Sequence, residues 1–244
     1  YYLNIFNKFL ITNVLFVMRD AYLGMPVIST FVLVMGAGYI IGGIRSCLIV
    51  GALVLFIALS EYWNRALITA YMATFAVGIS ALLGIVTGSI CARNEIATKF
   101  ILGVCDFFQT FPSFIYLIPV ILLFGITDTS VMIAAIAYAT VPATRYTVEG
   151  LRSVPPALQD AASMSGVSNF QRLVSIELPL AFPHIMLGIN QTLIFALMMI
   201  VLGALIGTED LGQIIMGSLS RPNGAGIGFT LGIFVSFICL AADN

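Results

Sequence analysis

Long apolar segments, separated by short polar ones, recur along the whole chain. The hydrocarbon core of a bilayer, about 30 Å thick, needs roughly 20 apolar residues in a helix. Glycines within several segments permit close packing of neighbouring helices. The candidate spans are Pro26–Gly43, Ser46–Ser60, Ala66–Ala92, Ile96–Phe124, Thr129–Pro142, Pro183–Ile206 and Ala225–Ala242. The pattern predicts an all-α polytopic membrane protein with about six to seven transmembrane helices.

Two segments depart from a simple succession of spans. Residues Tyr1–Tyr22 are apolar but contain asparagines and basic side chains, which predicts a tilted or interfacial helix. The fourth candidate span contains Pro112 and Pro119, and a proline removes a helix hydrogen bond. Such a break persists in a membrane only where protein or a wet cavity satisfies the freed backbone. We therefore expect a broken section at Gln109–Pro112, near a pathway.

The composition supports insertion in a membrane and excludes several other classes of protein. The chain is 60% hydrophobic and 9% charged, whereas soluble domains carry about 25% charged residues. Its net charge of -1 argues against a nucleic-acid partner. The chain opens at Tyr1 without methionine and stops at Asn244 straight after an apolar run, so we expect it to be a region of a longer protein.

Basic side chains are concentrated in alternate loops, and such loops face the cytoplasm. This bias places the loop 143–182 in the cytoplasm and Gly207–Gly224 outside. We divide the chain into residues 1–60, with N-terminal scaffold helices and the first spans, and residues 61–244, the core transmembrane domain. The basic residues that set the orientation are Arg45, Arg93, Lys99, Arg145, Arg152 and Arg172.

The loop 143–182 has the signals of a helical hairpin. Pro155 and Pro156 fit the first turn of a helix, and Gly166 can adopt the left-handed conformation that ends one. Ser168 and Gln171 have the spacing of a capping box, which starts a second helix. Pro179 is expected to end that helix before the next span. The first helix would carry Leu158, Ala161, Ala162 and Ser165 on one face, and the second an apolar face of Phe170, Leu173 and Val174.

Metal and nucleotide chemistry have little support in the sequence. The single His184 has no ligand cluster near it, so no metal site is expected. A phosphate-binding G-x-x-x-x-G-K-[ST] motif is absent, so the chain is not expected to hydrolyse ATP or to act as an enzyme. The cysteines lie in or beside apolar runs and are interpreted as free buried thiols: Cys47, Cys91, Cys105 and Cys239.

The hairpin also carries a motif. Asp160-Ala161-Ala162 is followed after three residues by Gly166, and after nine more by Ile176-Glu177-Leu178-Pro179. This spacing resembles the E-A-A loop of ABC importer permeases, with Asp160 where the family prefers Glu. The resemblance implies a loop that docks into a cleft of a cytoplasmic ATPase subunit and couples ATP binding to opening of the path. The coupling residues it implies are Ala157, Asp160, Ala161, Ala162, Met164, Ser165 and Gly166.

Further segments resemble permeases of the glycine betaine/proline type. They are Leu23–Pro26, Phe108–Pro119, Leu187–Leu193, Gly207 and Leu211–Gln213. This similarity implies the type I ABC importer permease fold in a bacterial inner membrane. It implies glycine betaine, choline, proline betaine or trimethylamine N-oxide as solute. The implied partners are two ATPases that bind ATP and Mg²⁺, a second permease copy forming a homodimer, and a substrate-binding protein, separate or fused. No cofactor is expected on this chain itself.

Polar and aromatic side chains within the spans are candidates for the translocation path. Each has a structural alternative, since polar groups also fix helix packing, aromatics also fill apolar contacts, and Asp160 alone fits a solvated helix charge. The path candidates are Asp106, Phe108, Gln109, Phe111, Pro112, Asn190 and Gln191. Two other functions stay open: an ABC permease for methionine, taurine or nitrate, and an ion-coupled carrier with Asp106 as coupling carboxylate. In the ion-coupled carrier alone, the hairpin would be a passive loop. Separately, the structural alternative to docking is a hairpin packed against its own membrane helices or lying on the lipid.

Overall fold

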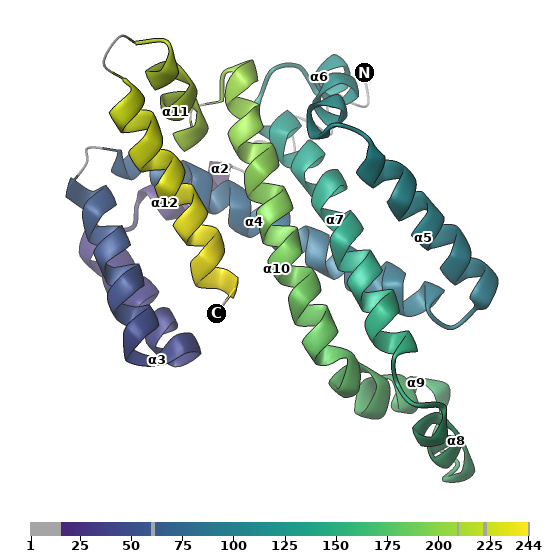
Figure 1. Cartoon of the computed structure of the whole chain (residues 1–244). Helices are drawn as coiled ribbons and strands as arrows, with labels where there is room; N and C mark the ends of the chain where they lie inside the picture. The colour runs from purple at the N-terminus through teal and green to yellow at the C-terminus, as the bar shows by residue number, and fades with distance from the viewer. Residues whose placement is uncertain (1–15, 60–61, 209, 222–223, 244) are drawn as a thin grey trace. The chain divides into compact units, whose positions relative to one another are not determined.

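The computed structural model describes residues 16–59, 62–208, 210–221 and 224–243, and these contain helices and no β-strand. Residue contacts divide the chain into two units. Unit 1 comprises residues 1–76, 113–135 and 196–244, and unit 2 comprises residues 77–112 and 136–195. Three long helices contribute to both units: α4 (Trp63–Cys91), α7 (Asp128–Arg152) and α10 (Leu178–Gly203) (Figure 1).

Unit 1 holds most of the remaining helices. They are α2 (Phe16–Leu23), α3 (Val27–Leu59), α6 (Leu117–Phe124), α11 (Leu211–Leu219) and α12 (Ala225–Asp243), with short 3₁₀ turns at Ser113–Tyr116 and Ala204–Ile206. Ile57, Leu211 and Leu231 form a buried apolar cluster that joins α3, α11 and α12. The chain bends by 95° between Val17–Leu23 and Val27–Ile40. The rest of the predicted interfacial helix, residues 1–15, lies outside the described residues.

The first two predicted spans together correspond to α3. They are two antiparallel helices joined at Gly43. Gly43 has φ 68° and ψ -160°, a conformation that glycine adopts without steric cost. A Cβ on Gly38 would lie 3.5 Å from Cys47 Cα, and one on Gly51 would lie 3.1 Å from Met35 Sδ. These pairs flank Gly43 symmetrically, so the chain reverses there. The predicted boundary between the two spans is confirmed.

Unit 2 contains α5 (Glu95–Thr110), α8 (Pro156–Met164) and α9 (Asn169–Arg172). Glycines allow its longer helices to approach closely. A Cβ on Gly88 of α4 would lie 2.7 Å from Thr147 Cβ of α7, and one on Gly188 of α10 would lie 2.8 Å from Tyr146 Cβ. Both contacts are too short for a larger residue, as expected for glycines that allow spans to pack closely.

Prolines end fewer helices than the sequence predicted. The fifth span was expected to end at Pro142, but α7 continues to Arg152 with Pro142 inside it. The packing of Thr147 on Gly88 extends over these added turns and stabilises them. The sixth span was expected to start at Pro183, but α10 begins at Leu178 and contains Pro183. Pro179 lies just after a π-helical turn at Leu173–Glu177, through which the helical backbone runs on into α10, so it does not end the second hairpin helix.

The break predicted at Gln109–Pro112 is present. Helix α5 ends at Thr110, and Phe111 adopts an extended conformation with φ -78° and ψ 138°. Within the described residues, four stretches are long and apolar enough to span a membrane, or up to six if each bent helix pair counts as one span. The chain is therefore an all-helical, multi-pass membrane protein, as predicted.

Among the cysteines, Cys47 and Cys105 are buried free thiols, as predicted. Cys91 is only partly buried, which corrects its prediction. The Cys239 side chain is not among the described side chains.

Candidate coupling hairpin

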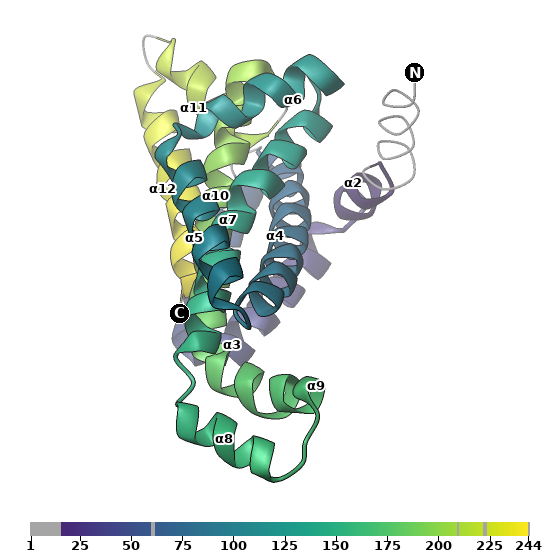
Figure 2. The ribbon, with the colours of Figure 1, turned by 90° about the vertical axis from the view of Figure 1, so that its right-hand side faces the viewer.

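The hairpin, residues Pro155–Glu177, lies between α7 and α10 and belongs to unit 2. Figure 2 shows α8 and α9 side by side beyond the ends of α5 and α7. The chain leaves α7 through a turn in which Ser153 Oγ donates to the Gly150 carbonyl at 2.7 Å. Val154 is buried at 3% exposure, and Gln159 Nε2 donates to its carbonyl at 3.2 Å. Val154 therefore anchors the base of α8.

Gly166 ends α8 in the predicted left-handed conformation, with φ 74°. The preceding Ser165 amide donates to the carbonyls of Ala161 and Ala162 at 3.1 and 3.2 Å. No atom lies within 4 Å of the place where a Cβ would be added to Gly166. The requirement for glycine is thus conformational, since the surrounding space would hold a larger side chain.

The second arm begins with the predicted capping box. Gln171 N–H donates to Ser168 Oγ at 3.2 Å, and Ser168 N–H donates to Gln171 Oε1 at 2.9 Å. After α9 the chain forms a π-helical turn at Leu173–Glu177 and then enters α10 without interruption. Arg172 Nε lies 2.9 Å from Glu177 Oε1, an ion pair that spans this wide turn.

The predicted coupling residues lie mostly on the surface of the hairpin. Ala162 is the exception at 6% exposure, so it forms the covered edge of the helix face that it shares with Ala161. The others are exposed: Ala157, Asp160, Ala161, Met164, Ser165 and Gly166. Large apolar side chains accompany them, with Met164 91% exposed and Phe170 71% exposed. The hairpin therefore presents apolar surface that unit 2 does not cover.

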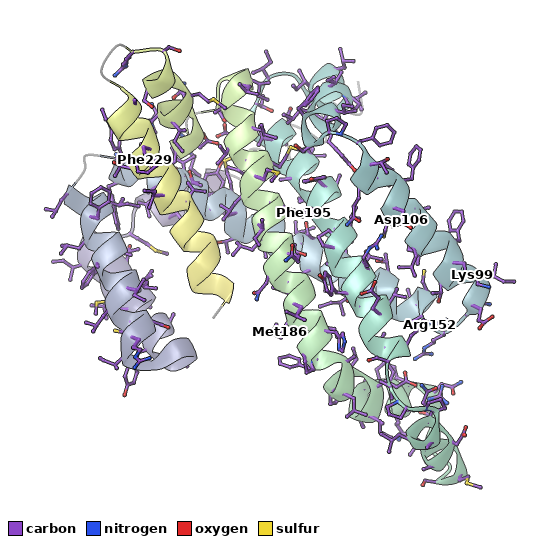
Figure 3. The ribbon with its side chains drawn as sticks, viewed as in Figure 1. Lys99, Asp106, Arg152, Met186, Phe195 and Phe229 are labelled. Carbon is purple, nitrogen blue, oxygen red and sulfur yellow. The ribbon has the colours of Figure 1, made fainter. Side chains whose placement is uncertain are left out.

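The path candidates lie in two places in unit 2, around the C-terminal end of α5 and on α10. Asp106, Phe108, Gln109, Phe111 and Pro112 lie at or after the end of α5, and Asn190 and Gln191 lie on α10. Arg145 of α7 forms an ion pair with Asp106, which Figure 3 labels on α5. The Phe107 ring packs edge-on against Phe111 at a centroid distance of 4.8 Å. Tyr138 and Phe195 stack at 4.8 Å.

A second polar site, in unit 1, was missed at the sequence level. Asp210 is fully buried and caps α11, accepting a hydrogen bond from Gln213 N–H at 3.1 Å and one from Thr208 Oγ1 at 3.2 Å. Burial is the largest influence on this carboxyl and raises its pKa to about 6. The D-x-x-Q spacing of Asp210 and Gln213 is the one signal that would have indicated this cap.

Two hydrogen bonds from α4 hold the segment that follows Asp210. Thr69 Oγ1 accepts from Leu211 N–H at 3.0 Å, and Arg65 Nη1 donates to Gln213 Oε1 at 2.9 Å. Both join residues more than 140 positions apart in the chain. No local pattern contains this pairing, and for that reason sequence inspection did not find it.

Comparison with known proteins identifies the family of the chain. Residues 84–244 match the family described as binding-protein-dependent transport system inner membrane component. The chain is 65% identical over 242 residues to the trimethylamine N-oxide transport system permease protein TmoV of Pelagibacter ubique, covering 99% of this chain and 34% of that protein. It is 41% identical over 226 residues to the TmoV of Ruegeria pomeroyi, covering 93% and 34%.

More distant relatives agree with this assignment. The glycine betaine/proline betaine permease ProW of Escherichia coli is 32% identical over 233 residues, covering 93% of this chain and 64% of ProW. A crystal structure of an amino acid ABC transporter with histidines has the same fold, with a TM-score of 0.56 at 17% identity over 76% of this chain and 95% of that one. The chain spans about a third of the length of the TmoV relatives. It belongs to the family of binding-protein-dependent transport system inner membrane components, the permeases of ABC importers, as the E-A-A-like motif predicted.

Proposed function

We propose that the chain is the permease part of an ATP-driven importer, and that the hairpin transmits the ATPase cycle to the spans. The single observation that carries this proposal is the uncovered apolar surface, including Met164 and Phe170, on a hairpin whose backbone is fixed by its own caps. A preformed, exposed helical projection suits docking into a groove on a partner. Its continuity with α10 would pass movement of α9 directly to a span.

The proposed solute is trimethylamine N-oxide or a related trimethylammonium compound such as glycine betaine or choline. The trimethylamine N-oxide and betaine transport functions of the TmoV and ProW relatives support this class. The proposed assembly contains two ATPase subunits, which bind ATP and Mg²⁺, a second copy of the permease, and a substrate-binding protein. The hairpin would face the cytoplasm of a bacterium, in agreement with the inner-membrane description of the family.

The ion-coupled alternative has less support. It requires Asp106 to bind and release a coupling ion, but Asp106 forms an ion pair with Arg145. A carboxylate whose charge is balanced by a guanidinium has a weaker attraction for a second cation.

Transport in proteoliposomes tests the driving force and the solute together. The assembled importer should accumulate labelled trimethylamine N-oxide only with internal ATP and external binding protein. A Na⁺ or proton gradient without ATP should leave uptake at the background level. Gradient-driven uptake that ignores ATP would contradict the proposal. Competition by unlabelled betaine, choline, methionine, taurine and nitrate would rank the solutes and would expose a different solute class.

Two substitutions at one position test the hairpin. Gly166→Val forces a β-branched residue into φ 74°, so we expect loss of the hairpin turn, at least ten-fold slower transport and weaker ATPase association, with normal membrane insertion. Gly166→Asn is the matched control, since Asn tolerates the left-handed region and the site has space for it. Fully coupled transport by Gly166→Val would argue against docking through this hairpin.

A further inference from the structure

Arginines from three segments line a cavity of about 410 Å³ within unit 2, beside the hairpin. Arg93 follows α4, Arg152 ends α7 and Arg172 ends α9. We call this cavity the arginine pocket. Ser89 of α4 also lines it.

Positive charge exceeds negative charge on this lining. Glu177 pairs with Arg172 and is the one carboxylate among the described lining residues. Arg152 Nη2 lies 3.8 Å from Glu95, whose side chain is 75% exposed, so this pair is largely screened by solvent. Arg93 donates to the neutral Asn169 carbonyl at 3.3 Å, and no described carboxylate forms an ion pair with it. At least one arginine of the pocket, Arg93, is therefore available to bind an anion.

A hydroxyl in the same pocket lacks a partner. Ser89 Oγ is buried and makes no hydrogen bond to any described residue. A buried hydroxyl without a partner is destabilising unless a ligand or water supplies one. Guanidinium groups and a hydroxyl are all donors, and together they match the oxygens of a phosphate group.

The pocket stands at the ends of two candidate membrane spans, where lipid head groups are expected. Trp63–Cys91 and Asp128–Arg152 are two of the candidate membrane spans, and Arg93 and Arg152 stand at their ends. Basic pockets at the ends of spans are suited to anionic lipid head groups. Figure 3 shows Arg152 at the end of α7 that leads to the hairpin.

An apolar groove of about 640 Å³ begins next to the pocket in the chain, since Glu177 lines the pocket and Leu178 lines the groove. Its lining includes Ile85, Leu178, Phe182, Met186 and Ile189. Ile85 precedes Ser89 by one turn on the same face of α4, about 6 Å away along the helix. From Leu178 to Ile189 the groove follows α10 for about 16 Å toward the middle of the span. Its lining is suited to an acyl chain.

We propose that the arginine pocket and the apolar groove form one binding site for an anionic phospholipid. The phosphate lies among Arg93, Arg152 and Ser89, and an acyl chain follows the groove along α10. The lipid would bind beside the hairpin and stabilise the junction of α4, α7 and α9. This site depends on neither the transported solute nor ATPase docking, so its test uses lipid binding and not transport.

Lipid retention measures how much the arginine charges contribute to lipid binding. The assembled importer is equilibrated in vesicles of equal phosphatidylglycerol and phosphatidylcholine, extracted, washed in detergent, and its bound lipids are counted by mass spectrometry. Wild type should retain phosphatidylglycerol preferentially. Arg93→Gln and Arg152→Gln should each reduce its retention about five-fold. Lys99→Gln removes an exposed charge from α5 and is the matched control, with unchanged retention expected. Equal retention by wild type and both arginine variants would overturn the proposal.

Two further arms distinguish a lipid from other occupants. Arg93→Lys keeps the charge and should keep most of the retention, which separates charge from misfolding. Phe182→Ser, at an exposed groove residue, should weaken phosphatidylglycerol retention, whereas 10 mM inorganic phosphate should not displace the lipid from wild type. Displacement by phosphate together with full retention by Phe182→Ser would assign the pocket to a soluble anion. Retention lost from wild type whenever the ATPase is removed would assign it to the ATPase interface. Either result would overturn the lipid site.

Discussion

Helix α10 is preceded by the hairpin and followed by the buried segment around Asp210, and these two connections are stabilised in opposite ways. The hairpin is fixed by bonds between near neighbours in sequence, such as the Ser168–Gln171 box, and most of its side chains are exposed. The segment 208–213 is fixed by bonds to α4, from Thr69 and Arg65, and Asp210 and Leu211 have no exposed surface. A locally stabilised connection can keep its own shape while its surface stays available to a partner. A connection held by distant residues buries its surface against other helices of its unit, and its position within that unit is fixed.

Removal of the buried cap should have the largest effect on stability. Asp210→Leu leaves the Gln213 amide and the Thr208 hydroxyl without their acceptor, so we expect a loss of about 3–5 kcal/mol in the free energy of unfolding. Asp210→Asn is the matched control, because its Oδ1 can accept from Gln213 and its NH₂ can donate to the Thr208 hydroxyl. Unfolding in detergent, followed by steric trapping, measures both. Equal losses would contradict the cap as the source of this stability.

The dependence of stability on pH that Asp210 causes should be the next largest effect. The folded-state pKa of Asp210, about 6, exceeds its ordinary value of 3.8, so the folded state binds more protons between these values. Stability should therefore fall as pH rises from about 4 to 6, by about 3 kcal/mol in all, and level off above 7. The difference between wild type and Asp210→Asn across pH 4–8 isolates this contribution. A difference that is flat with pH would contradict the buried-carboxylate explanation.

Loss of one distant bond should have a smaller effect. Thr69→Val keeps the shape of the side chain but leaves the buried Leu211 amide without an acceptor, and should cost about 2 kcal/mol. Thr74 is an exposed threonine on the same helix, and its hydroxyl bonds only within that helix. Thr74→Val should therefore change stability little. Hydrogen exchange of the α11 amides should accelerate in the first variant alone.

The smallest effect is expected in the hairpin. Ser168→Ala removes one bond of the capping box and should weaken the start of α9 by about 1 kcal/mol, or about five-fold in local hydrogen exchange. Ser168→Asp supplies another good cap and should restore protection. Neither change should reach α11. If Ser168→Ala also exposed the α11 amides, the two connections would not be independent, and the comparison between them would fail.

The same distinction explains what the sequence predicted. Gly43, Gly166 and the Ser168–Gln171 box each act on their own turn of backbone, and the structure confirms all of them. The ends expected at Pro142 and Pro179 were wrong. Packing of Gly88 on Thr147 outweighs the missing N–H of Pro142, and the π-helical turn at Leu173–Glu177 carries the helical backbone through Pro179 into α10. The bonds of Thr69 and Arg65 depend on which helices meet, and sequence spacing contains no such information. The roles of the coupling and path residues stay predictions.

The π-helical turn at Leu173–Glu177 sets the angular phase between the hairpin and α10. Such a turn contains one residue more than an α-helical turn, and each residue rotates a helix by about 100°. The faces of α9 and α10 are therefore offset by that rotation relative to one continuous α-helix. An insertion or deletion of a single residue here would leave both helices intact and turn Phe170 to another side of the molecule. Among related permeases, the length of this five-residue segment would then decide which surface of α9 faces the proposed ATPase partner.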